Sequence, residues 1–295
     1  MATHSNKTIL LTGATGHQGG AALQHLHRKF PLRVLVRDLE KRQVRTLAGP
    51  GVELVRGDLE DPASLQRAMD GVYGAHSMQT STDTAAEIRQ GTNMVDAATA
   101  QSIRHFVYSS VAAADQHTGI PHFESKGRIE QHIHATGIKH TILRPVFFME
   151  NWLNMKDQIL DGRLQLPLKP ETRLQMIAVD DVGAFVTLAF EHPGKWMGRT
   201  FDIAGDELSM TQLAEAFSRM VGHEVRYVQV PWDDFSKRID PAHFKMFQWF
   251  DRVGYHIDIA AVRQELPQLH SFERWLQNTW RAQVPAEPAG QSVHK

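Results

Sequence analysis

Three evenly spaced glycines, Gly13, Gly16 and Gly19, form the pattern that most directly suggests a chemical task. They follow an apolar run at residues 7–12 and precede an amphipathic run that ends at residue 26. A strand, a glycine turn and a helix in this order present unpaired N–H groups where the helix dipole also favours negative charge. Gly13 would turn the chain, Gly16 would admit a pyrophosphate, and Gly19 would let the helix pack on the sheet. The pattern predicts a dinucleotide site, against the alternative of a turn without a ligand.

Positive charge follows the second predicted strand, at residues 33–38. Arg37 stands near its end, and Lys41 and Arg42 come soon after. An acidic residue at this place suits the ribose 2′-OH of NAD, whereas an arginine suits a 2′-phosphate. Asp38 would repel that phosphate if its carboxylate pointed inward. We expect NADP(H) to be preferred over NAD(H), and a solvated charged loop is the alternative.

Apolar strands alternate with amphipathic helices along most of the chain. This alternation predicts an α/β protein: a Rossmann-type, doubly wound parallel sheet with a smaller, mostly helical C-terminal lobe. We predict a dinucleotide-binding domain at residues 1–150, a substrate lobe interleaved with it at 151–284, and a flexible tail at 285–295. A segment with two prolines, residues 164–172, is predicted to be a loop. The remaining predicted strands are 52–59, 71–78, 105–110, 141–144 and 200–204, and the longer predicted helices are 84–101 and 122–135.

The composition and charge of the chain argue against several classes of function. The 295 residues carry a net charge of −1 with no long basic run, so direct binding to nucleic acid is not expected. No apolar run reaches the roughly 20 residues that a membrane span needs. We see no signal peptide and expect a cytoplasmic protein. The chain has no cysteine, which excludes disulfides and thiol catalysis. His132 and His134 are too close in sequence to share one helix face, and we expect no metal site.

Several motifs together resemble the NmrA-like group of atypical short-chain dehydrogenases/reductases. The resemblance covers most of the chain, to about Trp280. That group includes NAD(P)H-dependent reductases of quinones, dyes and similar small molecules, and also non-catalytic proteins that sense NADP(H). The motifs are Thr12-Gly13-Ala14-Thr15-Gly16-His17-Gln18-Gly19, Gly57-Asp58-Leu59, His122-Phe123-Glu124-Ser125-Lys126-Gly127, Arg144-Pro145 with Glu150-Asn151, and Val179-Asp180-Asp181-Val182-Gly183.

The resemblance implies a set of cofactor contacts. The pyrophosphate would lie against the glycine turn, the 2′-phosphate against two cations, and the adenine against the turn after the third strand. A polar loop would line the middle of the cofactor. Lys126 would bind the nicotinamide ribose, as the donor chemistry of an ammonium also allows. The glycine-turn residues are Gly13, Thr15, Gly16, His17, Gln18 and Gly19. The two cations are Arg37 and Lys41, and the residues at the adenine are Asp58 and Leu59. The polar loop is Gln79, Thr80 and Ser81, and Phe148 and Asn151 would lie at the nicotinamide end, beyond Lys126.

One residue departs from the wider dehydrogenase pattern. Typical short-chain dehydrogenases carry a proton-donating tyrosine four residues before the lysine, where this chain has His122. His122 could act as the acid because histidine titrates near neutral pH, or it could simply begin a helix. Ser109 and Ser110 could place a substrate carbonyl, or could be ordinary turn residues.

Two functions remain open, with a lyase or isomerase as a weaker third. The first is an NADPH-dependent reductase of a small electron-poor acceptor such as a quinone, for which Phe147, Phe148 and Trp152 would form an aromatic wall. The second is an NADP(H) sensor that regulates another protein, which the missing tyrosine favours. The expected partner is therefore a small-molecule acceptor or a regulated protein, and a homodimer is possible.

Overall fold

The computed structural model describes residues 6–79 and 83–284. By compactness the chain divides into a first unit, residues 1–146 with 179–203, and a second unit, residues 147–178 with 204–295. The segment 179–203, which we predict to be in the interleaved C-terminal lobe, supplies two helices and a strand to the first unit. The predicted tail at 285–295 lies outside the described residues. Among the helices that are described, none has both the length and the hydrophobicity needed to cross a bilayer.

A parallel sheet forms the centre of the first unit, as the alternation of elements predicted. In the described part of the chain it has seven strands in the order β10-β6-β5-β4-β1-β2-β3. Ile9 of the central strand lies opposite Leu32 on one side and Gly74 on the other. The strand order reverses between β1 and β4, which is where open α/β sheets bind ligands. The strands are β1 Ile9–Leu11, β2 Leu32–Val36, β3 Val52–Arg56, β4 Gly74–Ser77, β5 His105–Ser109, β6 His140–Pro145 and β10 Thr200–Ile203.

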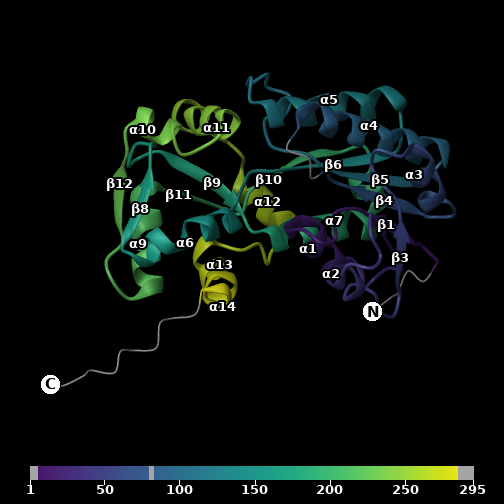
Figure 1. Ribbon diagram of the computed structural model, residues 1–295, viewed down its shortest axis with the longest axis horizontal. Coiled ribbons are helices and arrows are strands. Elements are labelled where there is room, and N and C mark those ends of the chain that lie inside the picture. The colour runs from purple at the N-terminus through teal and green to yellow at the C-terminus, as the bar shows by residue number, and fades with distance from the viewer. Residues whose placement is uncertain (1–5, 80–82, 285–295) are drawn as a thin grey trace. The chain divides into compact units, whose positions relative to one another are not determined.

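Helices cover both faces of this sheet (Figure 1). Helices α3, α4 and α5 lie on one face, and α1 and α7 lie together on the other. Buried side chains such as Leu65, Met94 and Ile129 join the first of these layers to Phe106 of the sheet. Apolar strands buried on both faces in this way make a rigid base for loops at the strand ends. The helices are α1 His17–Leu26, α2 Arg42–Arg45, α3 Pro62–Met69, α4 Thr84–Ala100, α5 Pro121–Thr136, α7 Val179–Glu191 and α8 Pro193–Trp196.

The second unit contains two small sheets besides its helices. In the larger one β11 pairs with β9, and β9 with β7. In the smaller one β8 pairs in parallel with β12, so the loop predicted at 164–172 is wrong in its first part. The prolines at positions 167 and 170 follow β8, so they end the strand without preventing it. The strands are β7 Phe147–Phe148, β8 Arg163–Leu166, β9 Arg173–Ile177, β11 Asp206–Ser209 and β12 Arg226–Gln229.

Aromatic side chains fill the core of the second unit. Trp152 is 1% exposed and its ring packs edge-on against Phe147 and Phe217. The aromatic wall that we predict for a flat acceptor therefore does not include Trp152, because its large apolar surface is buried in the core. Ser209 and Gln212 begin α9 with a capping box. The helical segments are η1 Met149–Met155, α6 Lys156–Leu160, α9 Met210–Val221, α10 Trp232–Ser236, α11 Pro241–Arg252, α12 Ile259–Glu265, α13 Phe272–Trp275, η2 Leu276–Trp280 and α14 Arg281–Gln283.

Candidate functional site

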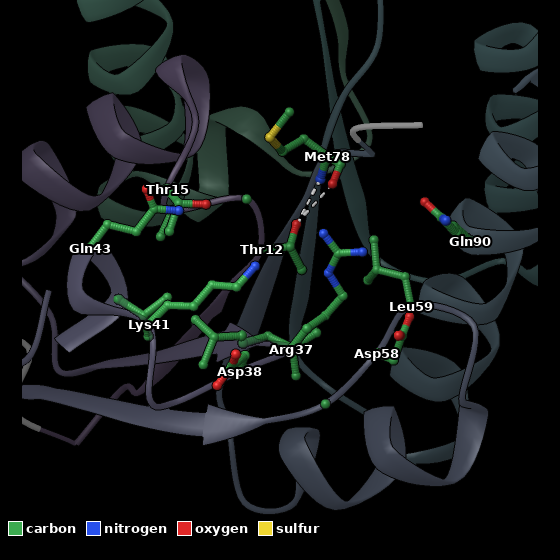
Figure 2. Close-up of a pocket in the computed structure, with 16 residues that line it drawn as sticks. Thr12, Thr15, Arg37, Asp38, Lys41, Gln43, Asp58, Leu59, Met78 and Gln90 are labelled. Atoms are coloured by element: carbon green, nitrogen blue, oxygen red, sulfur yellow. Dashed lines mark hydrogen bonds between the residues drawn. The ribbon is translucent and has the colours of Figure 1, made fainter. Parts of the chain in front are cut away.

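A pocket opens at the carboxyl ends of β1, β2, β3 and β4, within the first unit (Figure 2). Its cavity volume is about 170 Å³. Each of these strands contributes residues at or after its carboxyl end, and α4 contributes Gln90, so five separate segments of the sequence meet here. The pocket residues are Thr12, Gly13, Ala14, Thr15, Leu35, Val36, Arg37, Asp38, Lys41, Gln43, Val44, Gly57, Asp58, Leu59, Met78 and Gln90.

The glycine turn has the tight geometry that its sequence pattern predicts. Gly13 has φ +69°, and a Cβ there would lie 2.3 Å from the sulfur of Met78. A Cβ on Gly19 would lie 2.2 Å from the carbonyl carbon and oxygen of Gly13, so α1 approaches the turn too closely for any side chain. A Cβ on Gly16 would meet only the Gly13 oxygen, at 3.4 Å. The turn therefore has an open side at Gly16 and a closely packed side at Gly19.

The packing at Gly19 yields a direct prediction. We expect Gly19→Ala to lower the free energy of unfolding by about 2 kcal/mol, as overpacking of a filled site does. Gly20→Ala is the matched control on the same helix. A Cβ there lies 3.5 Å from the Ala14 oxygen, an ordinary contact, and alanine favours the helix by about 1 kcal/mol. Urea unfolding of both variants measures the difference, and equal effects would contradict the close approach.

The start of α1 keeps its backbone donors available. Gly16 is the N-cap and offers no side-chain cap to the first N–H groups in the described chain. At the start of α3, by contrast, the Asp61 carboxylate accepts from the N–H groups of Ala63 and Ser64, at 3.0 and 3.2 Å. Uncapped N–H groups and the positive end of the helix dipole suit an anion such as a pyrophosphate. The residues present therefore fit the phosphate end of a dinucleotide.

Two cations reach into the pocket from the segment after β2. Figure 2 shows the Arg37 guanidinium and the Lys41 ammonium pointing toward its centre. In the described chain neither of them forms an ion pair. The carboxylate of Asp38 instead accepts from the backbone N–H of Glu40, at 2.9 Å, which ties it to its own turn. This bond occupies one carboxylate oxygen of Asp38, which itself lines the pocket beside the two cations.

The floor of the pocket is fixed by Thr12, which the sequence analysis did not assign to the site. The Thr12 hydroxyl accepts from the Met78 N–H at 3.0 Å and donates to the Met78 carbonyl at 3.1 Å (Figure 2). These bonds extend the pairing of β1 and β4 beyond the ends of both strands. They place the Met78 side chain directly beneath Gly13. No local sequence signal marks Met78, since its role depends on a neighbour 66 positions away.

The predicted site residues are distributed as follows. Gly13, Thr15, Arg37, Lys41, Asp58 and Leu59 line the pocket. Gly16, His17, Gln18 and Gly19 form the start of α1 beside it. Gln79 follows β4, with its amide nitrogen donating to Ser77 at 2.9 Å. Its amide oxygen is buried and has no hydrogen-bond partner among the described residues. Phe148 and Asn151 belong to the second unit, in β7 and η1, and Thr80 and Ser81 lie outside the described residues.

The two serines at the end of β5 both donate hydrogen bonds to other side chains. Ser109 donates to the amide oxygen of Gln18 at 3.0 Å, which links the strand to the glycine turn. Ser110 donates to the carboxylate of Glu130, which also accepts from Arg144 at 2.9 Å. Both serines are 3% exposed. Their hydrogen bonds thus hold the carboxyl end of β5 in place.

Lys126 and His122 both lie on α5. The Lys126 ammonium pairs with the carboxylate of Glu87 on α4, and the same carboxylate accepts from the hydroxyl of Ser125. The Glu87 side chain is 4% exposed and that of Lys126 is 19% exposed. His122 is half-buried at the start of α5, with its ring edge-on to Phe123. The structure thus gives Lys126 a buried partner that the sequence analysis did not predict.

Comparisons with known proteins agree with this architecture. The model of the NmrA-like family matches residues 5–276. The chain therefore belongs to the NmrA-like family, as its motifs indicated.

Three matches illustrate the range of relatives and structures. An NAD(P)H azoreductase of Xenophilus azovorans is 29% identical over 225 residues, which are 75% of this chain and 77% of that protein. The crystal structure of an NADPH-dependent quinone oxidoreductase of Escherichia coli with NADPH has a TM-score of 0.80, at 21% identity, and covers 92% of this chain and 99% of its own. NmrA, a negative transcriptional regulator, in complex with NADP, has a TM-score of 0.78, at 21% identity, and covers 94% and 96%. At these identities the two structures confirm the fold.

Proposed function

We propose that this protein is an NADP(H)-dependent reductase that transfers hydride to a small electron-poor acceptor such as a quinone or an azo dye. The observation that carries the proposal is the pocket at the ends of β1 to β4. The uncapped start of α1 lies beside this pocket, and the side chains of Arg37 and Lys41 point into it. That pairing suits a ligand with a pyrophosphate and a second phosphate on its ribose. The relative named as an azoreductase supports the reaction class.

The residues of this chain would have separate tasks. The start of α1 would bind the pyrophosphate, Arg37 and Lys41 the 2′-phosphate, and Asp58 and Leu59 the adenine. Lys126 would bind ribose hydroxyls; its ammonium has three N–H donors, so the bond to Glu87 leaves others available. The cofactor, when bound, supplies the hydride, and the protein supplies orientation.

The proton requirement limits the choice of acceptor. Reduction of a ketone needs a proton donor placed at the carbonyl oxygen, and His122 stands where typical dehydrogenases carry a tyrosine. Reduction of a quinone or a dye needs less help from an acid. The proposed acceptor class is therefore compatible with His122 either as the proton donor or without a role in proton transfer.

The test is to measure NADPH consumption by the purified protein against quinones, azo dyes and aldehydes, with calorimetric binding of NADPH and NADH to the same preparation. Binding together with turnover of a quinone or dye supports the proposal. Failure to bind either nucleotide overturns it.

A regulatory sensor is the second candidate. The observations that favour it are the absence of a tyrosine four residues before Lys126 and the similarity in structure to NmrA, a negative transcriptional regulator. Tight NADPH binding without turnover of any acceptor would favour this candidate over the reductase.

The cations give a prediction about cofactor choice. We expect Arg37→Ala to weaken NADPH binding at least tenfold, because a charge-assisted bond to the 2′-phosphate is lost. NADH lacks that phosphate, so its affinity is expected to change little. Arg45→Ala is the control, since Arg45 lies outside the pocket. Calorimetric titration with both nucleotides measures the ratio, and an equal loss for both would exclude Arg37 from the 2′-phosphate site.

A further inference from the structure

A carboxylate just outside the pocket holds two adjacent side chains of α4. Glu60 follows Asp58 and Leu59 in the turn after β3. Its carboxylate accepts from Arg89, from Nε at 2.6 Å and from Nη2 at 3.1 Å, and from Gln90 Nε2 at 3.0 Å. Of the two α4 side chains, only Gln90 lines the pocket. Gln90 therefore connects the Glu60 carboxylate to the inner surface of the site.

The bond to Glu60 fixes which way the Gln90 amide faces. An ionised carboxylate only accepts hydrogen bonds, so the amide NH₂ must point to it. The hydrogen bonds from Arg89 and then Gln90 lower the pKa of Glu60, so it is ionised at neutral pH. The carbonyl oxygen of Gln90 must then point the other way. Figure 2 shows that oxygen on the side of the amide that faces the other pocket residues.

The wall around Gln90 is held independently of it. Arg89 makes two bonds to Glu60, and Asn93 of α4 donates to the carbonyl of Leu59 at 2.9 Å. These bonds attach the turn to α4 without Gln90. The Gln90 side chain is thus not needed as an attachment, and its carbonyl is an oriented acceptor beside the apolar side chain of Leu59. A flat base that contacts Leu59 would present its edge to that acceptor.

We propose that Gln90 is a specificity-determining residue, whose carbonyl oxygen accepts a hydrogen bond from the 6-amino group of a purine, and that Glu60 is the positioning residue that fixes this orientation. The inference rests on the proposed function, because it takes the adenine of a dinucleotide as the ligand. A purine with an oxygen at position 6 presents an acceptor instead. Two acceptors facing each other leave both unpaired, so the site would reject hypoxanthine in favour of adenine.

The experiment compares NADPH with its hypoxanthine analogue, in which a 6-oxo group replaces the 6-amino group and N1 carries a hydrogen. Dissociation constants are measured by calorimetry for the wild type, Gln90→Leu, Glu60→Gln and the control Gln43→Leu. We expect the wild type to prefer NADPH about tenfold, the effect of one hydrogen bond. Gln90→Leu should bring the two affinities within about twofold of each other. Gln43 lines the same pocket, and its replacement should keep the full preference.

Glu60→Gln tests the positioning role. A glutamine at position 60 can donate as well as accept, so the Gln90 amide can turn over and offer its NH₂ to the oxygen of hypoxanthine. We expect the preference for NADPH to fall in this variant although Gln90 is intact. Unfolding midpoints confirm that each variant is folded, and Gln90→Met serves if Gln90→Leu is not.

Each result separates this inference from the proposed function. Equal binding of both nucleotides by the wild type overturns the role of Gln90 but leaves a dinucleotide site. If Gln90→Leu keeps the preference for NADPH, the role of Gln90 is likewise overturned and the dinucleotide site remains. If Glu60→Gln keeps the preference, Glu60 is not a positioning residue. A wild type that binds neither nucleotide overturns the proposed function and this inference with it.

Discussion

Lowering the pH from 7 to 5 is expected to reduce the free energy of unfolding by about 4 kcal/mol. Burial lowers the pKa of His76 from 6.5 to about 4. Burial, and then the charge of His140, lower the pKa of His105 to about 4 as well. Between these values the unfolded chain binds protons that the folded chain does not, so stability falls as the pH falls from about 6.5 toward 4. Each histidine contributes about 2 kcal/mol to the loss at pH 5.

The surroundings of the two rings explain why neither accepts a proton. Neither ring nitrogen of His76 has a hydrogen-bond partner among the described residues. Thr141 donates its hydroxyl hydrogen to the Trp196 carbonyl at 2.8 Å, so His105 must donate from Nε2 to the Thr141 oxygen at 2.8 Å. The Nδ1 of His105 is then the unprotonated nitrogen, and it is buried without a partner in the described chain. A proton on either ring would be a buried charge without compensation.

His76→Leu provides the test. A leucine fills the site without titrating, so about half of the acid-induced loss should disappear and stability at pH 7 should not fall. Urea unfolding at pH 7, 6 and 5 measures both effects. His223→Gln, at an exposed position, is the control for the replacement of a histidine. The same slope in His76→Leu and in the wild type would show that His76 is not one of the groups responsible.

The second large effect is expected at Lys126. Lys126→Met removes the ionic partner of Glu87. Among the described residues, the remaining carboxylate is 4% exposed and keeps a hydrogen bond from Ser125 alone. Breaking a buried ion pair from one side costs about 3 kcal/mol or more, because the remaining charge stays desolvated. We expect a loss of about 3 kcal/mol in the free energy of unfolding. Arg128→Met, at an exposed position on the same helix, should change it by less than about 0.5 kcal/mol.

A double variant separates the two roles of Lys126. Glu87→Gln combined with Lys126→Met removes the uncompensated charge, so most of the lost stability should return. The affinity for NADPH should not return, because the proposed donor to the ribose is still missing. If Lys126→Met is as stable as the wild type, the pair with Glu87 does not contribute as described. If the double variant binds NADPH normally, Lys126 is not a cofactor residue.

The local pattern of the sequence was sufficient to predict the centre of the fold. The run from the first strand through Gly13 and Gly19 to α1 involves only neighbours in sequence, and so its strand, turn and helix follow from propensity and sterics. The alternation of short apolar strands and amphipathic helices likewise predicts a parallel sheet. Positions 164–166 were missed because two nearby prolines suggested a loop, although a strand can end just before a proline.

The candidate site was predictable where a residue lies in the loop that follows a strand. Arg37, Lys41 and Asp58 do so, and all three line the pocket. Gln90 lies in the middle of a long helix, and reaches the pocket because α4 packs beside the turn that contains Glu60. Glu87 meets Lys126 for the same kind of reason, across 39 positions of sequence. Such pairs depend on how helices pack over the sheet, which no single segment of sequence encodes.

The discontinuity of the first unit has a consequence for synthesis. Its edge strand β10 pairs with β6, and its helix α7 packs on α1, but both are encoded after the whole of segment 147–178. During translation, the edge of β6 therefore has no partner strand and one face of α1 stays uncovered. Both remain exposed until residue 203 has left the ribosome. Open edges invite pairing with other chains. A fragment that ends near residue 150 is accordingly expected to aggregate, and deletion studies of the pocket at the ends of β1 to β4 should keep the chain through residue 203.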